Sequence, residues 1–374
     1  MGVFLGLRLW RIEERLNFSM DQGMFMSRAR EIWQNKEITL LGPTASPVFE
    51  GRQFFQGPVI YYSLIVLGLI GRWDPIFMSW EMVILGLAGG GFLYLTINKL
   101  WGKKTAIVGS IAFTFWPTMI NFSNFIWNPN FLLTVTPLFL WLAVNSWWLW
   151  AGIVAGIGLQ FHFQFGLIIL ITIGWLIYKK QSLIKFLAGV IIGYSPLIIF
   201  DLRNNFYNIK TFTGWFLGGG KEGMGIQEHY LLSLTVLLIM VISWGLSKLN
   251  RYLVGVILLG LVVLSTTGVT KSLNGKYKEL VEIEKIIKNE NMTGFEVADL
   301  TTGDTRFYAL RYLLNKEGVK VMAVDEYPES DLIYVLAEKN NLKTNVWEME
   351  GYKNEPINYW RVSDKVMLYE LAKD

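Results

Sequence analysis

The sequence contains no cysteine and only two histidines, and 17% of its 374 residues are charged. The absence of cysteine excludes disulfides, thiolate metal sites and cysteine nucleophiles. With two histidines, a metal site would have to rest mainly on carboxylates. Soluble domains carry about a quarter charged residues, so the shortage of charge argues against a soluble protein. The net charge of +4 is small, and its placement tells more than its size.

Apolar residues take the place of the missing charge. The chain is 52% hydrophobic and 15% aromatic, with 16 Trp and 24 Phe, and its mean hydropathy is +0.36. This composition indicates an integral membrane protein. Several of its apolar stretches are shorter than the ~20 residues that a perpendicular helix needs, which predicts local thinning of the bilayer or helices that end inside the protein. The candidate spans are residues 76–98, 105–120, 131–147, 148–162, 163–178, 183–200, 230–246 and 252–269.

Three basic clusters, at 99–104, 179–185 and 248–251, separate these stretches. The positive-inside rule places all three in the cytoplasm. The apolar stretch 58–71 would extend only about 21 Å as a helix, so we expect it to lie along the outer face as an interfacial helix. The outward-facing segments are then the first loop (17–75), residues 121–130, residues 201–229, the neighbourhood of His162 and the tail after 270.

The two ends of the chain differ from its middle. The first ten residues are too few for a span and are typical of the end of a helix, so we expect a truncated first membrane helix. From residue 271 the composition is that of a soluble protein. The sequence predicts an α-helical polytopic membrane domain at 1–270, with about 8–9 membrane helices, and a small extracytoplasmic α/β domain at 271–374. In the latter we expect helices at 277–289 and 304–315 and strands at 295–300, 320–324, 332–337 and 365–371.

Polar side chains gather in the outward-facing segments, while the interiors of the spans are almost free of ionisable groups. A carboxylate that meets a hydroxyl acceptor can serve as general base, and arginine forks match phosphate oxygens. A Trp- and Phe-lined mouth suits a sugar and a prenyl chain. The parts therefore fit a transferase whose donor is a sugar on a lipid phosphate, because a phosphate that leaves readily requires one base where a glycosidase uses two carboxyls. The candidate site residues are Asp21, Arg28, Arg30, Glu31, Gln56, Trp127, Asn128, His162, Asp201 and Arg203.

Five short motifs follow one another along the chain. They are Asp21-Gln22 followed by Ala29-Arg30-Glu31-Ile32-Trp33, then Phe54-Phe55-Gln56-Gly57-Pro58, Phe125-Ile126-Trp127-Asn128-Pro129-Asn130, Leu159-Gln160-Phe161-His162, and Pro196-Leu197-Ile198-Ile199-Phe200-Asp201-Leu202-Arg203. With them the chain resembles, over about residues 7–208, GT-C type membrane glycosyltransferases of the dolichyl-phosphate-mannose protein mannosyltransferase class. The bacterial branch of that class includes the lipid A aminoarabinose transferases.

The resemblance implies that Asp21 is the catalytic base, that the donor is a polyprenyl-phosphate sugar and that the anomeric carbon inverts. At three positions this chain departs from the class. Met24 and Asn124 stand where members often carry Arg, and Gln56 stands where members often carry His or Glu. The donor phosphate is then left to Arg28, Arg30, Arg52 or Arg203.

Structural roles compete with several of these assignments. Glu31 is a second candidate acid but could pair with Arg28 instead. Arg28 and Arg30 point to different helix faces, so at most one is expected to reach the site. Arg203 could snorkel at the end of a span, and His162 could be a hydrogen-bonded structural residue.

The predicted function is transfer of a sugar from a polyprenyl-phosphate donor to a lipid, glycan or protein hydroxyl at the outer face of the cell membrane. The expected partners are this donor, the acceptor and membrane lipids, and not nucleic acid. The sequence demands no cofactor and leaves only a divalent cation open. A transporter or flippase of lipid-linked sugars would need polar groups in mid-membrane, where only Glu81 and His162 are candidates. A degenerate member acting as a membrane scaffold would tolerate Asp21→Asn.

Overall fold

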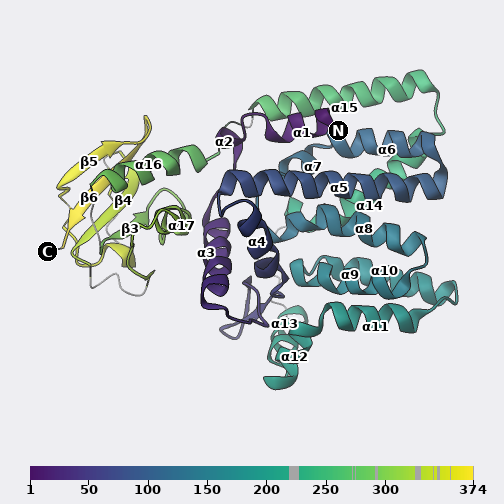
Figure 1. The fold of residues 1–374 in the computed structure, drawn as a ribbon, viewed down its shortest axis with the longest axis horizontal. Coiled ribbons are helices and arrows are strands. Elements are labelled where there is room, and N and C mark those ends of the chain that lie inside the picture. The colour runs from purple at the N-terminus through teal and green to yellow at the C-terminus, as the bar shows by residue number, and fades with distance from the viewer. Residues whose placement is uncertain are drawn as a thin grey trace. The chain divides into compact units, whose positions relative to one another are not determined.

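The computed structural model describes residues 1–218, 227–271, 273, 275–290, 294–324, 330–339, 341–342, 346–353 and 355–373. The chain forms two compact units (Figure 1). The first comprises Met1–Ile12 and Ala29–Leu273, and the second comprises Glu13–Arg28 and Asn274–Asp374. The boundary therefore falls inside helix α3 (Met20–Asn35), whose first nine residues belong to the second unit.

The first unit is almost entirely helical. Helices α5, α8, α9 and α11 lie side by side in that order (Figure 1). A small antiparallel hairpin of β1 (Thr44–Phe49) and β2 (Arg52–Phe55) precedes them in the chain. The helices are α1 (Gly2–Leu9), α4 (Val59–Ile70), α5 (Pro75–Trp101), α6 (Lys103–Phe115), α7 (Pro117–Asn121), α8 (Leu132–Val144), α9 (Trp148–Phe161), α10 (Phe165–Tyr178), α11 (Leu183–Gly193), α12 (Ser195–Arg203), α13 (Tyr207–Leu217), α14 (Leu232–Leu246) and α15 (Arg251–Lys271), with 3-10 turns η1 (Asn128–Phe131) and η2 (Glu228–Leu231).

Three helical segments among the described residues are long and apolar enough to cross a membrane: Pro75–Trp101, Glu228–Leu246 and Arg251–Lys271. The pair α11–α12 would make a fourth, but it bends by 69°. The candidate spans at 183–200 and 105–120 are each interrupted, between α11 and α12 and between α6 and α7. Prolines explain both breaks, because a proline ring clashes with the preceding turn and donates no backbone hydrogen bond. Pro196 lies at the start of α12, and Pro117 follows the end of α6.

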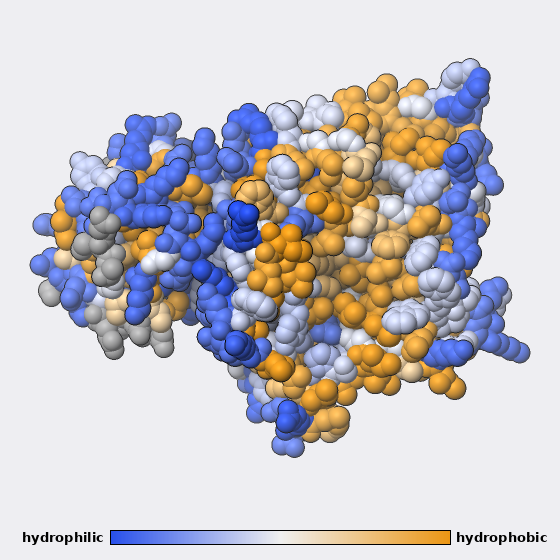
Figure 2. Space-filling model, viewed as in Figure 1, coloured by the Kyte–Doolittle hydropathy of each residue, from blue (hydrophilic) through white to orange (hydrophobic). Residues whose placement is uncertain are grey.

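The three basic clusters lie at one end of these helices. Lys104 Nζ donates to the Ser247 carbonyl at 3.2 Å, and Lys99 Nζ donates to Asn145 Oδ1 at 2.5 Å. The third cluster follows α10, whose last turns approach the start of α9 through a Trp148–Trp175 ring pair. Figure 2 shows a polar rim at this end and apolar side chains along the flanks of the helices. The helices thus have one basic end, as the positive-inside rule requires.

Helix α6 ends inside the bundle because side chains satisfy its last carbonyls. Arg8 on α1 is completely buried; it donates to the Thr114 carbonyl at 3.1 Å and to the Phe113 carbonyl at 3.5 Å. Ser265 donates to the Phe115 carbonyl. The final carbonyls of a helix have no partner within it, and unsatisfied backbone groups are costly where water is absent. These contacts allow the chain to break before Pro117.

The second unit combines helices with a four-stranded sheet of order β3-β4-β6-β5. Strand β3 runs parallel to β4, and β6 runs antiparallel to both β4 and β5. Its core consists of residues such as Ala298, Ile333 and Leu371. The elements are α2 (Ile12–Arg15), the start of α3, α16 (Tyr277–Asn289), β3 (Glu296–Asp299), α17 (Tyr308–Lys316), β4 (Leu332–Glu338), η4 (Trp347–Met349), β5 (Asn358–Arg361) and β6 (Val366–Ala372).

Most elements expected after residue 271 are present, with two corrections. The helix expected at 304–315 begins only at Tyr308, after Phe307 in the left-handed conformation, and the Asp304 side chain accepts the Tyr308 amide. The strand expected at 320–324 is reduced to a single bridge between Phe295 and Val321. Strand β5 was not predicted; its residues are mostly exposed, so it lacks the alternation that marks a half-buried strand.

Glycines allow α9 and α11 to pack with their backbones in contact. A Cβ at Gly156 would lie 2.5 Å from the Val190 carbonyl oxygen, and Cβ atoms at Gly152, Gly189 and Gly193 would also overlap backbone atoms of the facing helix. In each helix the two contacting glycines lie four residues apart, the spacing that brings small residues to one face of a membrane helix. The pair α9–α11 is thus a close helix contact that depends on small residues.

We expect Gly156→Ala to destabilise the protein, because the added methyl group meets backbone that cannot turn aside. Overpacking of this kind costs roughly 1–3 kcal/mol. Gly174→Ala in α10 is the matched control, since nothing lies within 4 Å of its added Cβ and alanine favours a helix by about 1 kcal/mol. Thermal unfolding in detergent should show a lower midpoint for Gly156→Ala only. Equal midpoints for the two variants would contradict the close packing.

Candidate functional site

Four of the five sequence motifs meet in the first unit through buried polar contacts. Asn128 Nδ2 donates to Gln56 Oε1 at 2.6 Å and to the Phe161 carbonyl at 3.0 Å. Both amide side chains are buried. Asn128 lies in η1, which opens α8, while Phe161 ends α9. One amide therefore connects the first loop to the last turn of α9 and satisfies a carbonyl that the helix leaves without a partner.

A second contact joins the first loop to the break between α11 and α12. The Gly57 amide donates to the Gln160 carbonyl at 3.1 Å, and a Cβ at Gly57 would overlap the Gln160 side chain. Gln160 Nε2 donates to the Gly193 carbonyl at 2.5 Å. The end of α11 is thus satisfied by an amide from α9. The Gln160 Oε1 atom is buried and has no hydrogen-bond partner.

Both histidines of the chain lie next to these contacts. The ring centroids of His162 and His229 are 5.6 Å apart, and His229 contacts Trp127 at 4.5 Å and Tyr230 at 4.2 Å. The Gln164 amide donates to His162 Nδ1 at 3.3 Å, so the neutral ring carries its proton on Nε2. His162 is buried and accepts a backbone hydrogen bond, so it has a structural role in this cluster.

Asp201 has a clear structural role. Its Oδ1 accepts the Asn208 amide at 2.7 Å and the Ile209 amide at 3.4 Å, which holds the first turn of α13. Asn208 in turn pairs with the backbone of Phe55: the Phe55 amide donates to Asn208 Oδ1 at 2.6 Å, and Asn208 Nδ2 donates to the Phe55 carbonyl at 3.1 Å. The Asp201 motif is thereby connected to the strand that leads into Gln56.

Two arginines of this unit are exposed. Arg203 lies at the end of α12, and Arg52 lies at the tip of the β1–β2 hairpin. Their segments adjoin, because the Tyr207 hydroxyl donates to the Gln53 carbonyl at 3.3 Å. Within the described residues, no group of three or more histidine and acidic side chains is arranged for a metal ion.

The fifth motif lies on α3. Asp21 and Arg28 are half-buried and are separated by seven residues, about two turns, so they share one side of the helix. Arg30 is nine residues from Asp21, about two and a half turns, and lies on the opposite side. Glu31 is exposed. The arginine that accompanies Asp21 on its helix face is therefore Arg28.

Three polar residues of the cluster, two buried and one half-buried, were not predicted as site residues. Gln160, Gln164 and Asn208 each bond to the backbone of another segment. The sequence carries a signal for the first two, because they flank one of the only two histidines in a long apolar region. Asn208 stands in a loop with other amide residues, and nothing in the pattern distinguishes it.

Comparison with known proteins gives one clear result. No protein-family model matches the sequence, and no curated protein matches it significantly. Two solved structures of ArnT from Cupriavidus metallidurans, at 11% sequence identity, match 99% of this chain and 96% of theirs. The TM-score is 0.64 for the structure bound to undecaprenyl phosphate and 0.62 for the apo state. ArnT is an aminoarabinose transferase of GT-C fold, so the chain has the GT-C fold that its five motifs led us to expect.

Proposed function

We propose that the protein transfers a sugar from a polyprenyl-phosphate donor to a hydroxyl acceptor. The observation that carries the proposal is the agreement in fold with ArnT over nearly the whole chain, since a solved structure of ArnT holds undecaprenyl phosphate. A second support is the cluster of polar segments at the helix ends opposite the basic rim. Because basic residues favour the cytoplasmic side, this polar end faces outward in the proposal.

Asp21 is the general base in this proposal. Its carboxylate takes the proton of the acceptor hydroxyl, and the acceptor oxygen attacks the anomeric carbon from the face opposite the phosphate. The bond between the anomeric carbon and the phosphate oxygen breaks, and its electron pair leaves with the lipid phosphate. The configuration inverts, and a positioned base of this kind contributes roughly 10²–10⁴-fold to the rate.

Arginines bind the phosphate in the proposed reaction. Arg28 is the first choice on α3, because it shares the Asp21 face, and Arg203 and Arg52 are exposed cations in the first unit. A guanidinium fork matches two phosphate oxygens and stays charged at any physiological pH. Asn128 donates a hydrogen bond to Gln56. We propose that these two amides and Trp127 shape the sugar side of the site. Glu31 and Arg30 remain further candidates, as do His162 and Asp201.

The transporter alternative gains no support from the buried charge that the structure reveals. Arg8 lies inside the helical bundle, but its guanidinium bonds to carbonyls at the end of α6 and to Ser123. A residue committed to ending a helix is a structural element rather than part of a pathway. The acceptor, the identity of the sugar and the use of a divalent cation are left to experiment.

We expect Asp21→Asn to abolish sugar transfer from synthetic polyprenyl-phosphate sugars, with a loss of at least about 100-fold. The measurement is product formation in membranes that contain equal amounts of inserted protein. Glu13→Gln is the matched control, because Glu13 is an exposed acid of the neighbouring helix α2 and should retain full activity. Equal transfer by wild type and Asp21→Asn would move the base to Glu31. No transfer from any donor by the wild type would favour the scaffold interpretation.

A further inference from the structure

The segment that carries Asp21 is built into the second unit. Phe18 packs edge-on against Tyr277 of α16 and at a tilt against Tyr312 of α17, each at 5.8 Å between ring centroids. The Gly275 amide donates to the Glu14 carbonyl at 2.8 Å. Phe18 is almost completely buried. Residues 14–18 are therefore held by a part of the chain more than 250 positions away in sequence.

Gly23 makes the closest of these contacts. A Cβ at this position would lie 2.5 Å from the Tyr308 carbonyl oxygen and 2.6 Å from the Ala309 amide nitrogen. Both are backbone atoms, which cannot turn aside as a side chain can. Since nonbonded heavy atoms are at their best about 3.5–4.0 Å apart, even one methyl group would displace α3 from α17 by about 1 Å. Only glycine allows the present distance.

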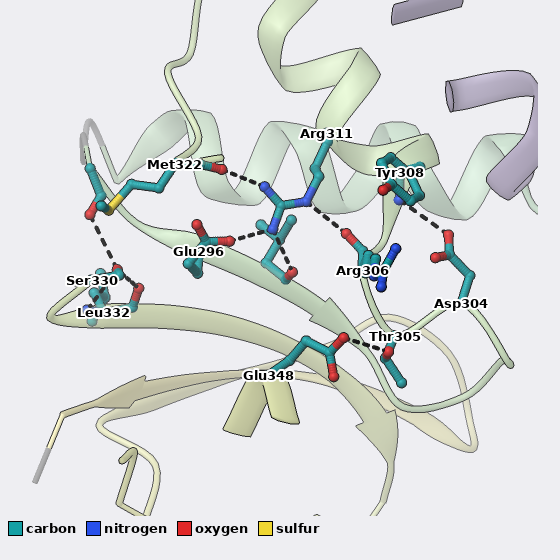
Figure 3. A network of polar contacts seen from close by, with 12 residues as sticks. Glu296, Asp304, Thr305, Arg306, Tyr308, Arg311, Met322, Ser330, Leu332 and Glu348 are labelled. Atoms are coloured by element: carbon teal, nitrogen blue, oxygen red, sulfur yellow. Dashed lines mark hydrogen bonds and ion pairs between the residues drawn. The ribbon is translucent and has the colours of Figure 1, made fainter. Parts of the chain in front are cut away.

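Helix α17 offers a fixed surface to Gly23 because a buried ion pair holds it to the sheet (Figure 3). Arg311 bonds to Glu296 of β3; it also donates from Nε to the Arg306 carbonyl at 2.7 Å and from Nη1 to the Met322 carbonyl at 2.5 Å. The guanidinium thus joins the helix, the turn before it and strand β3. Breaking a buried pair of this kind is strongly unfavourable, so α17 is held in place against the sheet.

The first turn of α3 is fixed as well. The Gln22 side chain reaches back to Ser19: Gln22 Oε1 accepts the Ser19 amide at 3.0 Å and the Ser19 hydroxyl at 2.7 Å. Gln22 is buried. Asp21 is therefore the second residue of α3. Ser19 fixes where this helix starts, and Gly23 fixes which face of the helix packs against α17.

We propose that the second unit is the support that sets the position of the Asp21 carboxylate, with Gly23 as the positioning residue. The inference rests on the proposed function, in which Asp21 is the base. It assigns a role to the α/β unit that neither an acceptor-binding nor a passive domain would have. A displacement of about 1 Å at a reacting group is enough to cost on the order of 100-fold in rate.

The test compares Gly23→Ala with Gly303→Ala. Gly303 belongs to the same unit, and nothing lies within 4 Å of its added Cβ, so this variant should behave as wild type. Gly23→Ala should lower kcat about 100-fold and leave the KM for the polyprenyl-phosphate sugar within about threefold, because only the base moves. Full activity of Gly23→Ala would overturn the proposal. A raised KM with unchanged kcat would overturn it too, since it would indicate a role in donor binding.

A combined variant separates positioning from general destabilisation. Asp21→Glu and Gly23→Ala both misplace the same carboxylate, so Asp21→Glu/Gly23→Ala should lose little beyond Asp21→Glu alone. Losses that multiply would show that Gly23 acts independently of Asp21. If Gly23→Ala does not insert in membranes, Phe18→Leu loosens the same segment and should lower kcat about tenfold without raising KM; an unaltered kcat there would overturn the proposal.

The proposed function fails in a distinguishable way. If Asp21→Asn transfers sugar as the wild type does, the base has been misassigned, and the positioning role falls with it. If Asp21→Asn is inactive while Gly23→Ala is fully active, the base stands and only the positioning role is wrong.

Discussion

The first unit depends on satisfying backbone groups wherever an apolar helix ends inside the protein. Arg8 and Ser265 serve the end of α6, Asn128 serves the end of α9, and Gln160 serves the end of α11. Without water, each unsatisfied carbonyl would cost several kcal/mol. Short helices in a membrane protein therefore require polar side chains at their ends, and these must come from other segments. This requirement brings four of the five motifs together in the first unit.

The same constraint separates supporting residues from those free to act on a substrate. Asn128 and Asp201 already bond to backbone groups, and His162 accepts the Gln164 amide. Residues with their hydrogen-bonding atoms committed are suited to shape a site. In the proposed function, exposed side chains such as Arg203 and Arg52 offer the charge for a phosphate. The proposed division is thus between amides that build the polar end and arginines that bind a donor.

The sequence predicted the class of fold, the grouping of the basic clusters and the motifs that meet at the polar end. These follow from composition, from the position of lysines and from motif order, which are local properties. It did not predict the break at Gly193, because the apolar run continues through it. Nor did it assign residues 13–28 to the second unit, since the contact of Phe18 with Tyr312 joins distant parts of the chain. The close approach of Gly23 likewise appears only when its neighbour is known.

The central claim is that this chain binds a polyprenyl phosphate, and binding can be measured without knowing the sugar or the acceptor. Native mass spectrometry of the detergent-solubilised protein should detect a one-to-one complex with undecaprenyl phosphate. Undecaprenol, which has the same chain and no phosphate, should bind far more weakly, because the arginines would have no anion to hold. Equal binding of the alcohol and the phosphate, or no binding of either, would contradict the account.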